Sequence, residues 1–264
     1  MLRFQLSVIA SVALCLTALS THRVNAGVLS DFDSAVTTAA TQTPGAWYTD
    51  RYAPNQFQSP ETGGGRSGTL LQGISIADSA ANRPSSFSSG FYNTQGRKFD
   101  LGSGTTGLSI EMYIDSTWEG LNQDRLAGLW ATGVDASNSI SAYPIIEFTN
   151  AGSGDFQIWD GAGFQSVGGF SGYGQWYEIG FDLVGSDFIY TVNGIDVFTD
   201  NTVGGTTEFS NVILQGYNAG NDYNIHWDNL QSNLQAVPEP ASFILFGVNA
   251  CCGLLTVRRR RRTP

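Results

Sequence analysis

The sequence predicts an all-β domain, and three features of the chain lead to this prediction. Short runs of alternating apolar and polar residues recur, turns rich in Gly, Asn, Asp and Ser separate them, and no long stretch shows the helical period with caps. The 32 glycines among 264 residues are typical of a chain with many turns. The segment 27–236 is long enough for one substantial core, so we predict a single β domain there.

The clearest strand signals follow Gly107, where apolar residues occupy every second position. The predicted strands are Leu108–Asp115, Leu126–Thr132, Ile145–Thr149, Phe156–Trp159 with Phe164–Val167 as a hairpin, Trp176–Leu183, Phe188–Val192, Ile195–Val197, Val212–Tyr217 and Asn224–Leu230. Asn193-Gly194 lies between two alternating runs and is the strongest short hairpin signal, because both turn residues must adopt positive φ. In the run Trp176–Leu183, the apolar alternates face the core and Trp176 faces away from it.

The segment between Ser30 and Gly107 is the least regular part of the predicted domain. Leu70–Ile76 and Phe87–Tyr92 are predicted as strands, and Gly63-Gly64-Gly65 as a flexible turn.

Several of these runs resemble a known family of β-sandwiches. W-Y-E-I-G-F-D-L, a short turn and then F-I-Y-T-V-N-G-I-D-V resemble the back half of laminin-G/concanavalin A-like jelly rolls. L-S-I-E-M-Y-I-D resembles an inner strand of such domains, and I-H-W-D-N-L their last strand. The resemblance covers Leu108–Leu230 and implies a concanavalin A-like jelly-roll β-sandwich. It implies little about function, because one fold carries many functions.

The C-terminal segment 237–264 predicts a membrane-sorting tail. A breaker, Pro238-Glu239-Pro240, precedes the uncharged apolar run Ala241–Val257, which would span about 25 Å as a single transmembrane helix. A cationic cluster follows, made of Arg258, Arg259, Arg260, Arg261 and Arg262. These arginines should stay on the cytoplasmic side and orient the helix.

The order of these three signals resembles the PEP-CTERM sorting tail of Gram-negative bacteria. The resemblance implies an exported protein that the tail holds transiently in the inner membrane and that an exosortase cuts near Pro-Glu-Pro. The alternative is an ordinary single-span anchor that is never processed.

The N-terminal segment 1–26 predicts a signal peptide. Arg3 supplies a positive charge, Leu6–Leu19 is apolar, and Val24-Asn25-Ala26 places small residues where a signal peptidase reads. The expected domains are therefore the signal peptide (1–26), a β-sandwich ectodomain (27–236) and the sorting tail (237–264). The expected location is the cell surface or the extracellular space.

Charge and cysteine positions limit the possible partners. The three cysteines, Cys15, Cys251 and Cys252, lie outside the predicted ectodomain, which therefore has no disulfides. The net charge is −10, and no Lys or Arg occurs from Leu126 to Val257. Such an acidic chain argues against nucleic acid or another anionic polymer as partner. Neutral sugars, bound cations and simple solubility remain open.

The sequence contains few candidates for catalysis. Glycoside hydrolases on this sandwich carry paired carboxylates on one strand, typically as E-x-D-x-E. That spacing is absent, and the candidate pair is Glu111 with Asp115, four residues apart on a well-defined strand. His226 and Asp228 form a second candidate, an acid/base pair on one strand face. Nucleophilic triads and zinc sites have no candidates. We therefore expect a protein that is not an enzyme.

Oxygen-rich loops leave a structural calcium site open, although no cofactor is expected. Asp135-Ala136-Ser137-Asn138 is one such loop, and the other, from Asn218, includes Asp222. Neither loop has the spacing of a known calcium motif, and both residue sets also suit turns.

Aromatic residues on the polar faces of strands are the best indication of a ligand. Trp159 and Trp176 both point away from the core on their strands. If the two strands lie in the concave sheet, their rings form one platform for a neutral sugar. The expected function is that of a carbohydrate-binding or structural surface protein, with exopolysaccharide as the candidate partner. The alternative is a polysaccharide hydrolase or lyase on the same fold.

Overall fold

The computed structural model describes residues 27–78, 83–87, 90–201, 204–218 and 220–233. The expected signal peptide and the expected sorting tail lie outside these residues. Among the described helices, none is long and apolar enough to cross a membrane.

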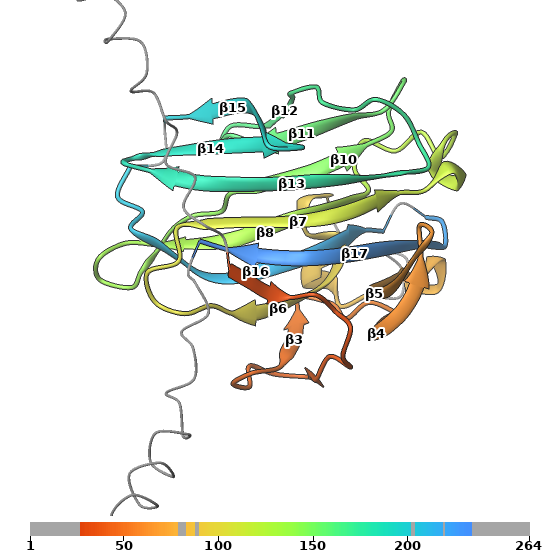
Figure 1. Ribbon diagram of the computed structural model, residues 1–264, viewed down its shortest axis with the longest axis horizontal. Coiled ribbons are helices and arrows are strands. Elements are labelled where there is room, and N and C mark those ends of the chain that lie inside the picture. The colour runs from red at the N-terminus through yellow and green to blue at the C-terminus, as the bar shows by residue number, and fades with distance from the viewer. Residues whose placement is uncertain (1–26, 79–82, 88–89, 202–203, 219, 234–264) are drawn as a thin grey trace, which may run out of the picture.

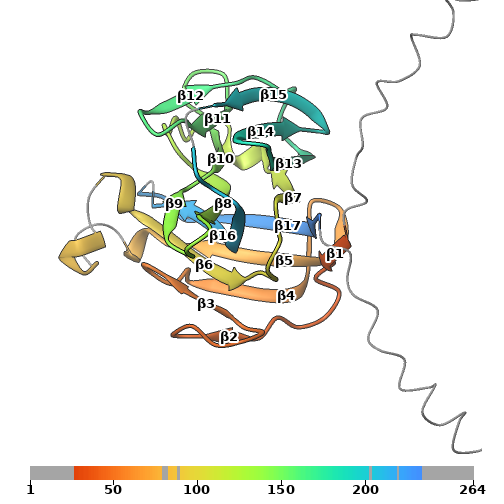
Figure 2. The ribbon, with the colours of Figure 1, turned by 90° about the vertical axis from the view of Figure 1, so that its left-hand side faces the viewer.

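Two β-sheets stacked face to face make up the described domain, as Figures 1 and 2 show from two sides. Sheet A has the strand order β15-β14-β13-β7-β17-β5-β4, with β1 beside β17. Its strands are β1 (Gly27–Ser30), β4 (Gln56–Gly63), β5 (Arg66–Ile74), β7 (Gly107–Ile114), β13 (Gln175–Val184), β14 (Asp187–Val192), β15 (Ile195–Asp200) and β17 (Tyr223–Ser232). The strand pairs of sheet A are antiparallel.

Sheet B has the order β12-β11-β10-β8-β16-β6-β3-β2, with β9 beside β8. Its strands are β2 (Thr38–Ala39), β3 (Trp47–Asp50), β6 (Thr94–Asp100), β8 (Ala127–Val134), β9 (Ile140–Ala142), β10 (Ile145–Thr149), β11 (Asp155–Trp159), β12 (Phe164–Ser166) and β16 (Glu208–Tyr217). Short 3-10 turns are η1 (Ile76–Asp78), η3 (Ser85–Phe87), η4 (Gly90–Tyr92) and η5 (Ser116–Trp118). The prediction of an all-β sandwich is confirmed.

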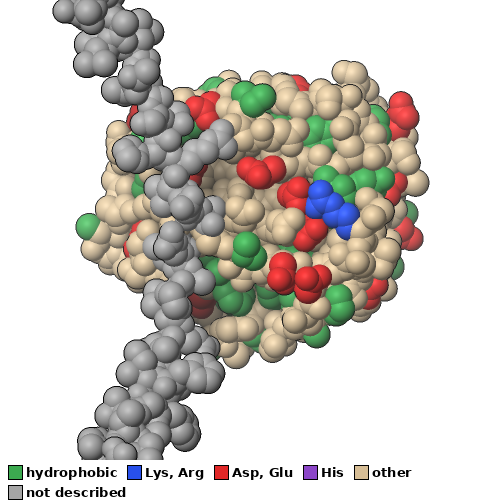
Figure 3. All heavy atoms as spheres, viewed as in Figure 1, with side chains coloured by type: hydrophobic (Ala, Val, Ile, Leu, Met, Phe, Trp, Pro, Cys, Tyr) green, Lys and Arg blue, Asp and Glu red, His purple; other side chains and the backbone are tan. Residues whose placement is uncertain are grey.

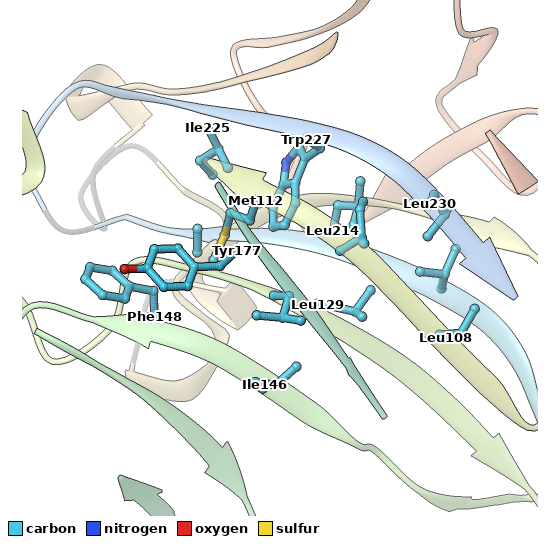
Figure 4. Close-up of a cluster of buried hydrophobic side chains, with 14 of the residues drawn as sticks. Leu108, Met112, Leu129, Ile146, Phe148, Tyr177, Leu214, Ile225, Trp227 and Leu230 are labelled. Carbon is cyan, nitrogen blue, oxygen red and sulfur yellow. The ribbon is translucent and has the colours of Figure 1, made fainter. Parts of the chain in front are cut away.

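The core fills the space between the sheets and follows the predicted alternation. On β7, Ile110 and Met112 are fully buried, and on β13 Tyr177 and Ile179 are buried to the same degree. Figure 4 shows Met112, Tyr177 and Trp227 of sheet A meeting Leu129, Ile146 and Phe148 of sheet B. Because side chains alternate along each strand, these inward residues force their neighbours onto the outer faces.

The predicted hairpin at Asn193-Gly194 is confirmed. Asn193 (φ 50°) and Gly194 (φ 70°) both lie in the left-handed region, between β14 and β15. This backbone geometry matches the twist of the two flanking strands.

One prediction for the region before Gly107 is wrong, and one strand there was missed. Phe87–Tyr92 is not a strand. The described residues there form the 3-10 turns η3 and η4, and Gly90 has a positive φ of 46° that interrupts an extended chain. Conversely, β4 was not expected, because its sequence Q-F-Q-S-P-E-T-G is polar and contains a proline. β4 is an edge strand of sheet A, where these residues are tolerated.

The alternation of inward and outward side chains predicts that two isoleucines of sheet A contribute very differently to the free energy of unfolding. Ile179 of β13 is 0% exposed and Ile195 of β15 is 69% exposed. Ile179→Ala is expected to lower the free energy of unfolding by about 2–5 kcal/mol, since it leaves a cavity between the sheets. The control Ile195→Ala should change it by less than about 0.5 kcal/mol. Urea unfolding measures both, and equal effects would contradict the placement of the core.

Candidate functional site

The outer face of sheet A gathers most of the residues that the sequence singled out. Antiparallel register sets Glu178 of β13, Glu111 of β7 and Asp228 of β17 side by side. Two residues along the same strands, a second row lies on the same face and consists of Trp176, Tyr113 and His226. We call these two rows, together with Arg66, the sheet A site. Figure 3 shows this face, where basic side-chain atoms lie among acidic ones.

Arg66 of β5 brings two carboxylates of the first row together. Its Nη1 lies 2.5 Å from Oε2 of Glu111 and 3.0 Å from Oδ2 of Asp228, and its Nη2 lies 3.2 Å from Oε1 of Glu111. Because one nitrogen contacts both carboxylates, those two oxygens are at most 5.5 Å apart (2.5 + 3.0). Asn229 also donates to Oε2 of Glu111 at 2.5 Å. The sheet A site thus contains a close carboxylate pair from two neighbouring strands.

The two carboxyl groups of this pair have opposite pKa shifts. The hydrogen bond from Arg66 is the main cause that lowers the pKa of Glu111. Burial is the main cause that raises the pKa of Asp228, although Arg66 opposes this shift. Arg66 therefore favours the ionised form of Glu111, and burial favours the protonated form of Asp228.

Aromatic rings lie next to the carboxylate pair. The guanidinium of Arg66 is 4.3 Å from the centre of the Trp176 ring, and the Tyr113 ring is 5.5 Å from the same ring. The indole Nε1 of Trp176 donates to the carbonyl oxygen of Gly64 at 2.9 Å. On the other side of the carboxylate row, Gly180 pairs with Ser109, and a Cβ atom on Gly180 would lie 2.9 Å from the Cβ atom of Ser109.

Neither of the two candidate pairs, Glu111 with Asp115 and His226 with Asp228, forms a direct contact. Asp115 lies beyond the end of β7, and its side chain accepts a hydrogen bond from Thr117 N at 2.8 Å, so it caps η5 and does not pair with Glu111. His226 and Asp228 do share one face of β17, but they have different partners. His226 Nδ1 lies 3.3 Å from Thr69 Oγ1, while Asp228 binds Arg66. Burial lowers the pKa of His226, which favours its neutral form.

The predicted platform of Trp159 and Trp176 is wrong, because the two residues belong to different sheets. Trp159 lies on the outer face of sheet B, half-buried between Phe91 and Phe164, with ring centres 5.2 Å away in each case. Trp159 therefore packs inside an aromatic cluster, and only Trp176 stands beside the carboxylates. Alternation along a strand gives the face of a residue but not the sheet that carries it.

The outer face of sheet B holds a buried ion pair that sequence reasoning missed. Arg125 Nε and Nη2 bind the two carboxylate oxygens of Glu147 at 2.7 and 3.0 Å, and Gln157 Nε2 donates to the same carboxylate at 2.8 Å. Four rings surround the guanidinium at 4.7–5.5 Å, those of Phe91, Trp130, Phe164 and Tyr217. With all of its carboxylate oxygens engaged, Glu147 serves to hold this face together.

Two further places offer fewer side chains that could bind a ligand or take part in catalysis. A 210 Å³ cavity lies near β1 and contains one titratable residue, Asp31, among apolar neighbours such as Leu29, Trp47 and Phe99. The weak calcium candidates both accept hydrogen bonds from the backbone: Asp135 accepts from Ser137 and Ser139 in its own loop, and Asp222 accepts from the distant Ile76 N. Among the described residues, no three His, Cys, Asp or Glu side chains cluster as a metal site would require.

The buried pair gives a prediction for stability. Arg125→Met should lower the free energy of unfolding by about 3–5 kcal/mol, because it leaves Glu147 buried without its cation. The double variant Arg125→Met/Glu147→Leu should recover most of that loss, since it removes the unpaired charge. Chemical unfolding of the three proteins tests this. A double variant as unstable as the single one would mean that Arg125 acts mainly through its packing against the rings.

Comparison with known proteins identifies the fold. No family model matches the chain, and no curated protein matches its sequence. A non-specific endo-β-1,3(4)-glucanase from family GH16 has a similar structure, with a TM-score of 0.50 and 10% identity over 79% of this chain and 94% of that one. A Bacillus licheniformis β-glucanase scores 0.47 at 11% identity, over 79% of this chain and 99% of that one. A sialidase scores 0.44 at 10% identity, and this domain covers only 17% of its length. The chain therefore has the jelly-roll sandwich fold that the glucanase also has.

This comparison corrects the expectation that the protein is not an enzyme. An endo-β-1,3(4)-glucanase from family GH16 has the same fold, so the fold gives no ground for that expectation. The sequence argument failed because it looked for two carboxylates on one strand. In this protein the close pair forms between β7 and β17, which are far apart in the chain.

Proposed function

We propose that the protein is a polysaccharide-active protein, and that the sheet A site binds a neutral glycan and hydrolyses it. One observation carries the proposal: two carboxylates with oxygens at most 5.5 Å apart have pKa values displaced in opposite directions. Such a divergence separates the base or nucleophile of a pair from its acid. The likeness to the glucanase supports the fold on which this chemistry would take place.

The roles of the two carboxylates follow from their protonation. Asp228, whose pKa is raised, donates its proton to the glycosidic oxygen while the bond from that oxygen to the anomeric carbon breaks. Glu111, which stays ionised, attacks the anomeric carbon from the other side. Water then releases the sugar from Glu111, and Asp228 accepts the proton of that water. A separation of about 5–5.5 Å between carboxyl groups is typical of hydrolases that retain configuration.

The surroundings of the pair favour a neutral polymer. A sugar ring stacked on Trp176 would gain roughly 0.5–1.5 kcal/mol beyond area burial, judging from aromatic pairs. Glu178 lies next to Glu111 in the same row, and the described chain after Arg125 has no Lys or Arg, so an anionic polymer would be repelled. Mixed-linkage β-1,3(4)-glucan is the first substrate to test, because the similar glucanase is named for it.

Removal of either carboxylate tests the reaction. Glu111→Gln and Asp228→Asn should each lower kcat on mixed-linkage β-glucan by about 10²–10⁴-fold, because each removes one proton-transfer or nucleophilic group. The control Asp182→Asn removes the same charge from the same face of β13, two positions beyond Gly180, and should keep wild-type activity. Reducing-end release measures the rates. Equal activity in all three variants would refute the assignment.

The pH dependence gives an independent test. Activity requires Glu111 ionised and Asp228 protonated, so kcat/KM should fall on the acidic side as Glu111 gains a proton and on the other side as Asp228 loses one. Arg66 lowers the pKa of Glu111. Arg66→Gln should therefore move the acidic limb of the profile to higher pH. A profile with an unchanged acidic limb would show that Glu111 is not the ionised partner.

We also propose that the ends of the chain export the protein and anchor it for a time. The residue patterns at 1–26 and 237–264 support this proposal, and an exosortase-type enzyme would be the processing partner. The mature protein from its native host should then lack Arg258 to Arg262, since cleavage near Pro238 removes them. Intact mass of the surface-released protein measures this, and recovery of the complete C-terminus would contradict it.

A further inference from the structure

The tip of the β4–β5 hairpin lies directly on the rings of the sheet A site. The turn residues Gly64 and Gly65 have positive φ values of 58° and 77°. A Cβ atom on Gly64 would lie 2.6–2.7 Å from the rings of Tyr113 and Trp176, and a Cβ atom on Gly63 would lie 2.1–2.3 Å from the ring of His226. Glycine at both positions therefore allows the backbone of the tip to rest flat on these rings.

Arg66, at the start of β5, fastens the tip to the site. Its guanidinium covers the Trp176 ring at 4.3 Å and binds both Glu111 and Asp228. The tip also accepts the indole hydrogen bond of Trp176 through Gly64. The ring face and the carboxylates that a glycan would need are thus the surfaces that the tip occupies.

The tip projects beyond the hydrogen-bonded body of sheet A. β5 pairs with β17 from Leu70↔Trp227 to Ile74↔Tyr223, and this ladder does not include Arg66–Thr69. β4 and β5 stay paired to each other as far as Gly63↔Arg66, with irregular register between Gln58 and Thr62. Gly68, with a φ of 81°, lies just before the point where pairing with β17 begins. Side-chain contacts, rather than a strand ladder, hold the tip down.

We propose that the hairpin tip, residues 62–67, is a strap that closes the sheet A site in the free protein and swings away at Gly68 when a glycan binds, with Arg66 as its latch. This inference rests on the proposed function, because it assigns a form of regulation to the same site. When the strap opens, the Trp176 ring, Glu111 and Asp228 become accessible to a sugar.

A reversible disulfide tests whether the strap must open. The Cβ position of Gly63 is 2.3 Å from Cγ of His226. Adding one carbon–carbon bond of about 1.5 Å puts the two Cβ atoms within about 3.8 Å of each other, which suits a disulfide. The variant is Gly63→Cys/His226→Cys in the full chain, with Cys15, Cys251 and Cys252 replaced by serine so that no other disulfide forms. The parent is the same chain with only the serine substitutions.

The probe is a mixed-linkage β-glucan oligosaccharide, and binding is measured by calorimetry. The oxidised variant should bind at least about tenfold more weakly than its own reduced form, a change of about 1.4 kcal/mol or more. Equal binding by the oxidised and reduced forms would overturn the strap. If the parent and the reduced variant bind no oligosaccharide, both the proposed function and the proposed role of the strap are refuted.

A second measurement examines the latch without any glycan. Arg66→Gln should raise amide hydrogen exchange in residues 62–67 at least about tenfold, while β7 and β17 keep their protection. The matched control is Lys98→Gln, which removes a cation from an ion pair with Asp50 on sheet B and should leave the tip unchanged. Unchanged exchange in the Arg66→Gln tip would overturn Arg66 as the latch even if glycan binding is normal. This result separates a failed strap from a failed site.

Discussion

The packing of two sheets through one apolar face each is the constraint on which the rest of this protein depends. Ile110, Met112, Tyr177 and Ile179 fill the space between the sheets and fix which side of β7 and β13 is inward. Since side chains alternate along a strand, the intervening residues have no choice but to face outward. The composition of the sheet A site is thus a consequence of how the core is packed.

The register of sheet A creates an electrostatic problem that Arg66 relieves. Glu178, Glu111 and Asp228 lie on three adjacent strands, where like charges oppose one another. Arg66 supplies the cation that this row lacks, and it comes from a hairpin whose tip leaves the ladder of the sheet. The position of the tip and the charge state of Glu111 and Asp228 therefore depend on each other.

The two outer faces of the sandwich differ in how their charges are used. On sheet B, Arg125 and Glu147 are both nearly buried and their groups pair with each other inside a ring of aromatic side chains. On sheet A, Arg66 is about one-third exposed and shares its charge between two carboxylates. Breaking a buried, fully paired ion pair costs much free energy, so it favours a fixed structure. Breaking a partly solvated ion pair costs less, so a ligand can replace it more easily. This difference is why the sheet A site is the functional candidate.

The sequence by itself determined the local features of this protein, and the tertiary structure decided how they combine. Alternation predicted β7, β13 and β17 and placed Glu111, Trp176 and Asp228 on polar faces, while Asn193-Gly194 predicted its hairpin. Alternation has a range of a few residues, so it could not tell that Trp159 belongs to the other sheet, or that β4 would form at an edge. The contact between Arg66 and Asp228 joins residues 162 positions apart, and only the register of the folded sheet brings them together.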